Sequence, residues 1–379
     1  MMSEHYIGLM SGTSMDGVDG VLVAFDATAS QPKMRVLAHH AAPLPEPLKQ
    51  TLLALNTSAD DELHRAALAA NALVRVYADV VQVLLQASHM SATDVRAIGA
   101  HGQTVRHQPG LHDGVGYTLQ LNQPALLAEW CGIDVVADFR SRDVAAGGQG
   151  APLVPVFHHH VFGRADQTVA VLNIGGIANL SVLHGLPHSR DGQVHGWDCG
   201  PGNVLMDLWC HAHTGQAYDV DGAWAASGTV SEPLLAHLLR EPFLAAPPPK
   251  STGRDLFHEP WLRAHLRDFA HLSPQDVQAT LTAFTAQVCA RDLRTHAADA
   301  RALLVCGGGA RNGTLMRHLA LALPSLDVKS TETQGLPPLQ VEAAAFAWLA
   351  RQCMHRQTGN ASSVTGARGA RVLGAIYPR

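Results

Sequence analysis

The sequence predicts an α/β protein with two related halves, and three observations lead to this fold class. A strand–glycine turn–strand pattern at 6–25 returns at 168–183. Short apolar strands alternate with helical segments along much of the chain, which favours parallel α/β units. The 379 residues are 47% hydrophobic and 16% charged, a composition typical of a large buried core rather than disorder.

Each of the two similar patterns is predicted to form two strands joined by a glycine-containing turn. In the first, an apolar strand at 6–10 leads into turn residues at 11–17 and a second strand at 18–25. In the second, Gly175-Gly176 separates two apolar strands. No shorter repeat indicates a solenoid.

The segments between these patterns supply the helices and further strands. Helical periodicity covers 47–87, and 122–132 is predicted as a helix that joins two short buried strands at 96–105 and 132–139. Polar loops are expected after both of these strands.

The last third of the chain continues the alternation. The sequence Ser273-Pro274 starts a predicted helix over 272–297, with proline in its first turn. A strand, a glycine turn and a helix follow from 301, and 341–354 is a final helix. Residues 245–255, rich in Pro, Ser and Gly, are predicted to form a surface loop.

Charge and composition argue against several classes of protein. The formal net charge is −5, and the four lysines are scattered, so we expect neither nucleic-acid binding nor a basic membrane patch. The first residues carry Glu4 and no basic segment before an apolar run, and we found no apolar run of membrane-spanning length. Six scattered cysteines favour reduced thiols. A soluble cytoplasmic protein is therefore expected.

Three glycine turns, each directly after an apolar strand, suggest a nucleotide site. The turn at 11–17 combines glycines with Ser and Thr hydroxyls, which suits an anion nest, although an ordinary hairpin would also fit. Asp16 and Asp19 favour a divalent cation beside a phosphate. The turn at 307–309 also resembles half of a dinucleotide fingerprint, with Asp327 beyond it, but the third glycine is replaced by Asn312.

Polar residues near strand ends are the candidates for chemistry. Gln103 and Thr104 follow one strand, and Arg142 follows another. Asp198 lies in a Gly/Pro-rich turn before a helix that should begin near Val204, so it is either a turn residue or a general base. The histidines at 158–160 lack zinc-site spacing, although His158 could line a cleft.

In chain order, the sequence contains GLMSGTSMDGVD, AHGQTVRH, ADFRSRDVAAGGQGAP, LNIGGIANLS, GWDCGPGNVLMD, PKSTGRD and LLVCGGGARN. Over nearly its whole length it resembles the anhydro-N-acetylmuramic acid kinases of bacterial cell-wall recycling. The resemblance implies two ribonuclease-H-like (actin-like ATPase) domains around a nucleotide cleft, with residues 1–150 and 343–379 in one domain and 151–342 in the other.

The resemblance also implies a role for particular residues. The first phosphate loop would be Gly12, Thr13, Ser14, Met15, Asp16, Gly17, Val18 and Asp19, and the second would be Gly175 and Gly176. Gly307, Gly308 and Gly309 would lie against adenosine, and Asp198 would be the general base. Sugar-side candidates are Gln103, Thr104, Arg142, His158 and Glu342. The usual acid-x-Gly of the wider superfamily is replaced by Leu9-Met10-Ser11, so Asp16 and Asp19 are the first candidates for Mg²⁺, acting through water.

The implied reaction uses ATP and Mg²⁺ to open the 1,6-anhydro ring of 1,6-anhydro-N-acetylmuramic acid and to phosphorylate O6. The products would be N-acetylmuramate 6-phosphate and ADP, and the resemblance also implies a homodimer. Three alternatives remain open at this point: another ATP-dependent sugar kinase of the same superfamily, a dinucleotide-binding oxidoreductase, and a non-catalytic actin-like or chaperone ATPase.

Overall fold

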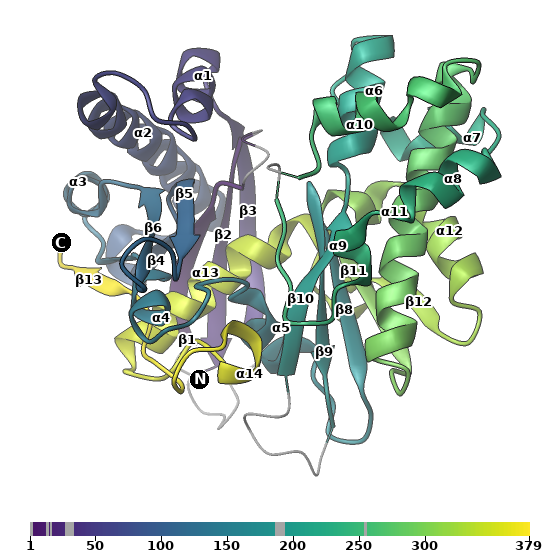
Figure 1. The fold of residues 1–379 in the computed structure, drawn as a ribbon. Coiled ribbons are helices and arrows are strands. Elements are labelled where there is room, and N and C mark those ends of the chain that lie inside the picture. Colours follow the sequence, from purple (N-terminus) through teal and green to yellow (C-terminus); the bar gives the residue numbers. More distant parts are fainter. Residues whose placement is uncertain (1–2, 13–14, 16, 27–33, 186–193, 254–255) are drawn as a thin grey trace. The chain divides into compact units, whose positions relative to one another are not determined.

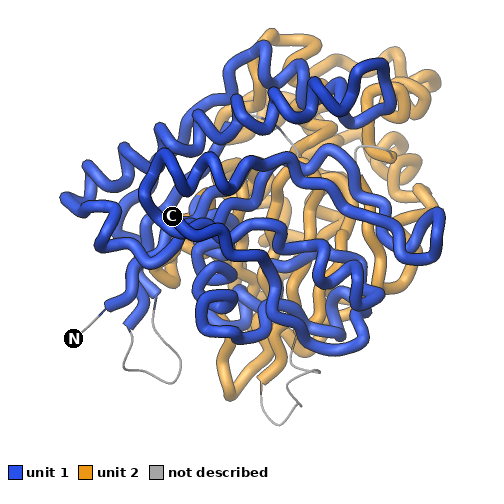
Figure 2. Tube along the Cα trace, turned by 90° about the vertical axis from the view of Figure 1, so that its left-hand side faces the viewer, with its two compact units in different colours: residues 1–161, 340–379 blue, residues 162–339 orange. Residues whose placement is uncertain are grey.

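The chain forms two compact units in a computed structural model that describes residues 3–12, 15, 17–26, 34–185, 194–253 and 256–379. Unit 1 comprises residues 1–161 and 340–379, and unit 2 comprises 162–339 (Figure 2). The domain boundaries proposed from sequence are 150/151 and 342/343, whereas the compact units divide at 161/162 and 339/340.

Unit 1 contains a six-stranded sheet with the order β13-β7-β4-β1-β2-β3 (Figure 1). The strands are β1 (Ser3–Met10), β2 (Gly17–Asp26), β3 (Met34–Pro43), β4 (Val95–Ala100), β7 (Val135–Ala137) and β13 (Ala375–Tyr377). β1, β2 and β3 are successively antiparallel, whereas β4 is parallel to β1 and β7 is parallel to β4. β5 (Gln103–Pro109) and β6 (Gly116–Leu121) form a separate hairpin.

Helices cover both faces of the unit 1 sheet. They are α1 (Glu46–Ala54), α2 (Glu62–Ser88), α3 (Pro124–Cys131), α4 (Ser141–Ala145), α5 (Val154–Phe162), α13 (Val341–Met354) and α14 (Ser362–Thr365). Side chains alternate along a strand, so Ile7 and Leu9 of β1 pack in the core formed with α2, while Tyr6 and Gly8 point to the other face. α13 lies on that second face (Figure 1).

Two glycines let α13 approach the sheet at backbone distance. A Cβ at Gly8 would overlap the carbonyl oxygen of Ala343, and one at Gly99 would overlap that of Phe346. Any side chain at either position would therefore push the helix away from β1 or β4.

Unit 2 repeats the strand order of unit 1 in a five-stranded sheet, β10-β9-β8-β11-β12. Its strands are β8 (Val169–Ile174), β9 (Ile177–Leu183), β10 (Val194–Pro201), β11 (Ala302–Cys306) and β12 (Asp327–Ser330). The first three are successively antiparallel, and β11 and β12 continue in parallel from β8. Three antiparallel strands followed by two parallel ones define the ribonuclease-H-like order, so the prediction of two related domains of this fold is confirmed.

The helices of unit 2 pack around one large apolar core. They are α6 (Val204–Thr214), α7 (Ala223–Ala226), α8 (Glu232–Leu238), α9 (Pro242–Ala245), α10 (Glu259–His265), α11 (Pro274–His296) and α12 (Gly313–Ala322). α11 begins as the sequence predicts, because the Ser273 side chain accepts a hydrogen bond from the Asp276 N–H and Pro274 occupies the first turn.

The structure corrects four local predictions. The segment 47–87 forms two helices, α1 and α2, rather than one continuous pattern. The strand predicted at 96–105 is interrupted after Ala100, and Gln103 and Thr104 begin the next strand, β5, rather than a polar loop. Asp198 lies within β10 rather than in a turn, although α6 does begin at Val204. Lys250 is buried, although the surrounding segment is the expected loop.

Two further properties concern α2 and the cysteines. α2 is long and apolar enough to cross a membrane by length and composition alone, but 56% of its apolar window is buried within the protein. A mostly buried core helix passes the same test.

All six cysteines lie in the described part of the chain, and all are free thiols, as predicted.

Candidate active site

The second glycine turn, Gly175-Gly176 between β8 and β9, lies against the N-terminus of α6. The N–H groups of Gly202 and Val204 donate to the carbonyl of Gly176 at 2.9 and 3.1 Å, and the Asn203 N–H donates to that of Gly175 at 2.8 Å. These bonds hold the hairpin turn beside the first turn of an 11-residue helix, where backbone dipoles favour an anion.

The third glycine turn, Gly307 to Gly309, lies in the same region. A Cβ at Gly309 would overlap the Ile174 side chain, and Gly307 has a positive φ of 76°. The Asn203 side chain donates from Nδ2 to the Ile174 carbonyl at 3.1 Å and lies 3.3 Å from the Cβ position of Gly308. Asn203 thus connects the second and third turns, which are far apart in the sequence.

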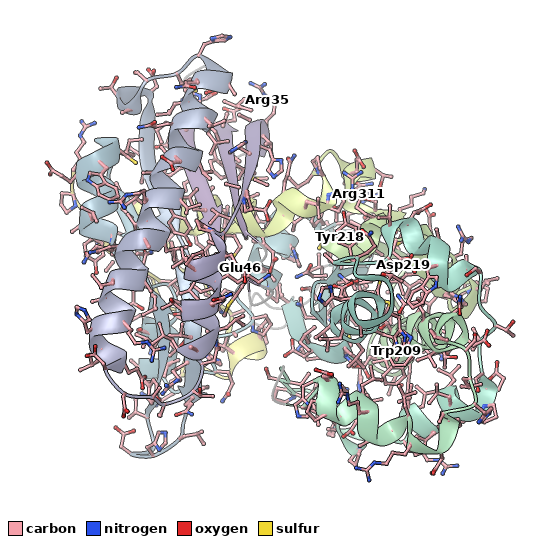
Figure 3. All side chains as sticks on the ribbon, turned by 90° about the horizontal axis from the view of Figure 1, so that it is seen from above. Arg35, Glu46, Trp209, Tyr218, Asp219 and Arg311 are labelled. Atoms are coloured by element: carbon pink, nitrogen blue, oxygen red, sulfur yellow. The ribbon has the colours of Figure 1, made fainter. Side chains whose placement is uncertain are left out.

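A loop after α6 reinforces the start of α12, directly beyond the third turn. Asp221 accepts a hydrogen bond from the Gly313 N–H at 2.8 Å, and Thr314 Oγ1 donates to the Gly222 carbonyl at the same distance. Figure 3 shows Tyr218 and Asp219 of this loop on the same side of unit 2 as Arg311. Tyr218 is 60% exposed, which leaves its ring available to a ligand.

Asp198 is partly buried and held through one of its two carboxylate oxygens. Ser251 Oγ donates to Oδ2 at 2.8 Å, and the Thr252 N–H donates to the same oxygen at 3.0 Å. Among the described residues, none donates a hydrogen bond to Oδ1. The Asp198 N–H donates to the Lys250 carbonyl at 3.1 Å, so the backbone is fixed as well.

The environment of Asp198 favours its action as a base. Burial raises the pKa of the Asp198 carboxyl above its usual value, while the bonds from Thr252 and Ser251 and the charge of Lys250 oppose this rise. A carboxylate with a raised pKa accepts a proton more readily near neutral pH. Asp198 lies inside strand β10, so it does not serve as a turn residue.

The first glycine loop is fixed at its start by buried polar groups in unit 1. Ser11 Oγ and Tyr77 Oη share a hydrogen bond of 3.0 Å, and the Gly102 N–H donates to the same tyrosine oxygen at 3.1 Å. Gln103 Nε2 donates to the Gly12 carbonyl at 3.1 Å. Thr13, Ser14 and Asp16 lie outside the described residues. Among the remaining residues of this loop, Met15 and Val18 are buried. Gly17, Val18 and Asp19 already belong to strand β2.

Of the two acids suggested for Mg²⁺, only Asp19 is described. Its side chain is 43% exposed, and Oδ1 lies 3.3 Å from His39 Nε2. Among the described residues, no group of three or more His, Cys, Asp or Glu side chains could enclose a metal ion. Mg²⁺ usually keeps several waters and uses one or two carboxylates together with substrate phosphates. One accessible carboxylate beside a glycine loop fits that pattern.

The sugar-side candidates of unit 1 are dispersed over several elements. Gln103 is fully buried and ties β5 to the first loop, and Thr104 Oγ1 accepts a hydrogen bond from Gln120 Nε2 at 3.3 Å. Arg142 in α4 is exposed. His158 in α5 is 1% exposed, and its burial lowers the pKa of the imidazole to about 3, so the ring is neutral.

Glu342 in α13 belongs to a charged group that the sequence did not reveal. Its charge raises the pKa of Arg140, although burial dominates and lowers that pKa to about 10. Arg140 donates from Nε and Nη2 to His101 Nε2 at 3.1 and 2.9 Å, and from Nη1 to the Gly150 carbonyl at 2.8 Å. Arg140 therefore fixes the loop that follows α4.

Asp143, a carboxylate on α4, is engaged in a structural network. It is fully buried and accepts hydrogen bonds from Asn360 Nδ2, Thr365 Oγ1 and the Gly150 N–H. Both of its oxygens accept hydrogen bonds and the side chain is fully buried, so Asp143 is less accessible to a ligand than the partly buried Asp198.

The structure therefore connects some of the candidates within each unit, while Arg142, His158 and Glu342 of unit 1 lie on separate elements. In unit 2, Asn203 links the second and third glycine turns; in unit 1, Gln103 links β5 to the first loop. Sequence reasoning missed the roles of Asn203, Ser251 and Thr252. Their signal was present in the segments GWDCGPGN and PKSTGRD, but no local pattern tells which backbone group each contacts.

Two sequence comparisons give the same family over nearly the whole chain. A family model described as anhydro-N-acetylmuramic acid kinase matches residues 4–379. A protein of that name from Albidiferax ferrireducens is 60% identical, and one from Variovorax paradoxus is 59% identical, each over 100% of both chains. A solved structure titled as an activator of the 2-hydroxyisocaproyl-CoA dehydratase from Clostridium difficile, with bound ADPNP, matches with a TM-score of 0.45 and 14% identity, covering 91% of this chain and 93% of that one.

Proposed function

The chain belongs to the anhydro-N-acetylmuramic acid kinase family, and we propose that Asp198 is the general base of its reaction. The enzyme uses ATP to open the 1,6-anhydro ring of 1,6-anhydro-N-acetylmuramic acid and to phosphorylate O6, in the recycling of the cell wall. The observation that supports the base is the Asp198 carboxylate, which is oriented through Oδ2 and accepts no hydrogen bond at Oδ1 from any described residue.

The bond changes assign one task to Asp198. Oδ1 accepts a proton from a water molecule while the water oxygen attacks C1 of the sugar. The bond between C1 and the bridging oxygen breaks, and this oxygen, O6, attacks the γ-phosphorus of ATP. The bond from that phosphorus to the bridging oxygen of ADP breaks in turn. The products are N-acetylmuramate 6-phosphate and ADP.

The glycine turns are proposed to position the nucleotide. Phosphoryl transfer depends mainly on alignment and on stabilising the phosphate charge. In unit 2, Gly175-Gly176 and the N-terminus of α6 would bind phosphate oxygens, and Gly307 to Gly309 would lie against the adenosine. In unit 1, the loop from Gly12 to Asp19 would bind phosphates as well. These assignments make unit 2 the adenosine-binding domain.

Mg²⁺ is proposed as the second cofactor, with Asp19, and Asp16 outside the described residues, as the carboxylates that hold it through water. The ion would neutralise phosphate charge when bound. Asp19 is suited to this because it is partly exposed and its only close ionic partner among the described residues is His39.

The sugar is proposed to contact Gln103, Thr104, Arg142, His158 and Glu342. Arg142 suits the carboxylate of the muramic acid, because an exposed guanidinium offers a planar pair of donors. His158 is buried and neutral, so within this proposal it would contribute shape and a hydrogen bond rather than charge.

Replacement of the proposed base is the direct test. Asp198→Asn keeps the size of the side chain and the backbone bond to Lys250, so both ligands should still bind. Loss of the basic oxygen should lower kcat by about 10²–10⁴-fold, or more if ring opening and phosphoryl transfer share the proton. The measurements are kcat, sugar affinity and thermal stability. A folded variant with nearly unchanged kcat would overturn the assignment.

Isotope labelling tests the order of the bond changes independently of any variant. In oxygen-18 water, label should appear at C1 of the product and be absent from its phosphate. Mass spectrometry of the product and its fragments reads this directly. Label in the phosphate without label at C1 would instead indicate hydrolysis of ATP followed by a different transfer.

Gly12→Val tests the first phosphate loop. The branched side chain should obstruct a backbone that must approach phosphate, and so weaken ATP binding at least about tenfold. The fold should survive, because the loop leaves β1 at its end. Nucleotide titration and circular dichroism give the two readouts, and unchanged affinity would make this turn a plain hairpin.

Another sugar kinase activity is the main alternative for the substrate. Incubation with ATP and a panel of anhydro and ordinary amino sugars, followed by mass spectrometry, would separate the two.

The oxidoreductase hypothesis depended in part on Asp327, which is exposed and forms an ion pair of 2.6 Å with Lys329 on β12. Family membership gives the kinase instead.

We also propose a homodimer, which the resemblance implies, and a cytoplasmic protein that binds neither nucleic acid nor membrane, which charge and composition favour. Light scattering of the purified protein tests the mass in solution, and cell fractionation tests the location. The two units would be the functional domains.

A further inference from the structure

A buried ion pair lies next to the segment that holds Asp198. Lys250 Nζ is 3.0 Å from Oδ2 and 3.2 Å from Oδ1 of Asp292 in α11, and the two side chains are 3% and 5% exposed. Trp197 Nε1 donates to Asp292 Oδ2 at 2.9 Å. The proposed reaction gives these three side chains no role.

The pair joins both segments that carry Asp198 to a single carboxylate. Trp197 precedes Asp198 on β10, and Lys250 precedes the two residues that hydrogen-bond the Asp198 carboxylate. The Lys250 carbonyl accepts the Asp198 N–H. β10 is the edge strand of its sheet, so at Asp198 this contact takes the place of a further strand.

Building on the proposed role of Asp198, we propose that Lys250 and Asp292 are positioning residues for it. Their ion pair fixes residues 250–252 against α11, so that Ser251 and Thr252 direct the Asp198 carboxylate with Oδ1 free to accept the proton. Neither residue acts on the substrate.

A purely structural role is the competing explanation. Breaking a buried ion pair by removing one partner is strongly destabilising whatever its function, whereas replacing both partners together often preserves stability. A loop of Pro, Ser and Gly could be anchored by an apolar side chain at lower desolvation cost. A positioning role is therefore visible only where stability is retained and catalysis is not.

The charge of Lys250 affects the pKa of Asp198, so its removal should shift the pH dependence of kcat. Loss of anchoring alone would not cause this shift. The Lys250 charge is one of the influences that oppose the rise in the pKa of Asp198 caused by burial. Titratable groups beside the pair include Cys199 on β10 and Cys289 on α11, and His296 of α11 packs against Trp197 with ring centroids 5.5 Å apart. Hydrogen bonding to Cys289, together with burial, raises the pKa of Cys199 well above its usual value. The Cys199 thiol therefore remains neutral across the working pH range.

The test compares Lys250→Met with Lys250→Met/Asp292→Asn. The single variant leaves the Asp292 charge unpaired and should lose stability. The double variant carries no buried charge, and the new amide oxygen still accepts the Trp197 N–H, so thermal stability should return. We expect kcat of the double variant to stay at least about tenfold low, because a misplaced base loses rate steeply. The acid limb of its pH profile should move to higher pH, and KM for ATP should change less than twofold.

Arg351→Met is the matched control. Arg351 forms a largely buried ion pair of 3.2 Å with Glu4 in unit 1, with side chains 10% and 26% exposed. Loss of this ion pair should lower stability without moving the acid limb of the pH profile of kcat. This separates the effect of any broken buried pair from an effect on Asp198.

Each result of these measurements supports or overturns the positioning role of Lys250 and Asp292. A double variant with wild-type kcat and pH profile overturns the positioning role, and so does a double variant that fails to fold, since the pair would then serve the fold itself. Asp198→Asn is measured alongside. If Asp198→Asn still turns over, the base assignment fails. If it is inactive and the double variant is normal, only the positioning role fails.

Discussion

The two helices that bury one face of each sheet, α13 in unit 1 and α11 in unit 2, are fixed in different ways. The buried surface of α13 is almost wholly apolar, and the helix lies directly on the glycines of β1 and β4. α11 also buries apolar side chains, but it adds five buried polar ones: Gln278, Thr280, Thr282, Thr285 and Asp292.

The polar groups of α11 reach outward to the elements that carry candidate site residues. Thr285 Oγ1 donates to the Gly202 carbonyl at 2.9 Å, and Asp292 binds Trp197 and Lys250. In unit 1 the comparable polar contacts come from α2, β5 and the loop after β7 instead, through Tyr77, Gln103 and Arg140. The comparison shows that α13 is held mainly by steric fit, with the Arg351–Glu4 ion pair in addition, whereas α11 also contacts the segments that carry the candidate site residues.

The largest expected effect follows from steric fit in unit 1. Gly99→Val places a branched side chain where a Cβ alone would already overlap the Phe346 carbonyl. We expect a loss of at least about 3 kcal/mol in the free energy of unfolding, because helix or strand must move. Denaturant unfolding measures this.

Gly110→Ala provides the control for the glycine itself. Gly110 has a positive φ, 72°, which Gly99 does not, and a Cβ at Gly110 meets no atom within 4 Å. The cost should stay near about 1 kcal/mol, from the left-handed conformation alone. If both variants cost the same, close approach to α13 does not fix unit 1.

An intermediate effect should appear on acidification, through the buried neutral histidines of unit 1. Burial lowers the pKa of His158 to about 3, while an unfolded histidine titrates near 6.5. The unfolded state therefore binds the additional proton as pH falls below about 6.5, and stability decreases toward pH 3. His158 alone should remove about 2 kcal/mol between pH 6.5 and pH 5.

The check is the pH dependence of unfolding for the wild type and for His158→Phe. The variant should show a shallower decrease over the same pH range. His101, whose pKa is also well below the usual value because of burial and the charge of Arg140, should preserve part of the slope. Parallel curves for the two proteins would contradict the prediction.

The smallest expected effect distinguishes two threonines on α11. Thr285→Val leaves the Gly202 carbonyl without its donor and should cost about 1–2 kcal/mol, together with weaker ATP binding. Thr282 Oγ1 donates to Gln278 of its own helix, so Thr282→Val should cost less and leave ATP binding unchanged. Equal effects of the two variants on ATP affinity would mean that α11 does not orient the site.

Sequence patterns predicted the elements whose signals are local. The apolar run of 341–354 coincides with α13, and Ser273-Pro274 starts α11 as expected. Both hairpins were indicated by apolar strands on either side of glycine turns. These features need only neighbouring residues, so periodicity and capping suffice to find them.

Asp198 and Lys250 were misread because their settings are not local. The surrounding Gly196, Gly200 and Pro201 indicate a turn, but an edge strand tolerates such residues. Lys250 stands in a Pro-rich loop, and its burial depends on Asp292, 42 residues further along the chain. Arg140 likewise meets His101 across 39 residues. Side-chain pairs at such separations leave no periodic pattern.

The glycine-to-backbone fit of α13 has a consequence for the order of folding during synthesis. α13 belongs to the segment 340–379, whereas most of the sheet that it covers is made first, and the whole of unit 2, 162–339, comes between. At about 5–20 residues per second, the ribosome needs roughly 10–35 s to make that insert. During this time one face of the first sheet has no helix to cover it, so nascent unit 1 should depend on chaperones, while unit 2 can fold as a continuous segment. A chain ending at Leu339 should accordingly protect unit 2 from protease and leave the segment 1–161 open to cleavage.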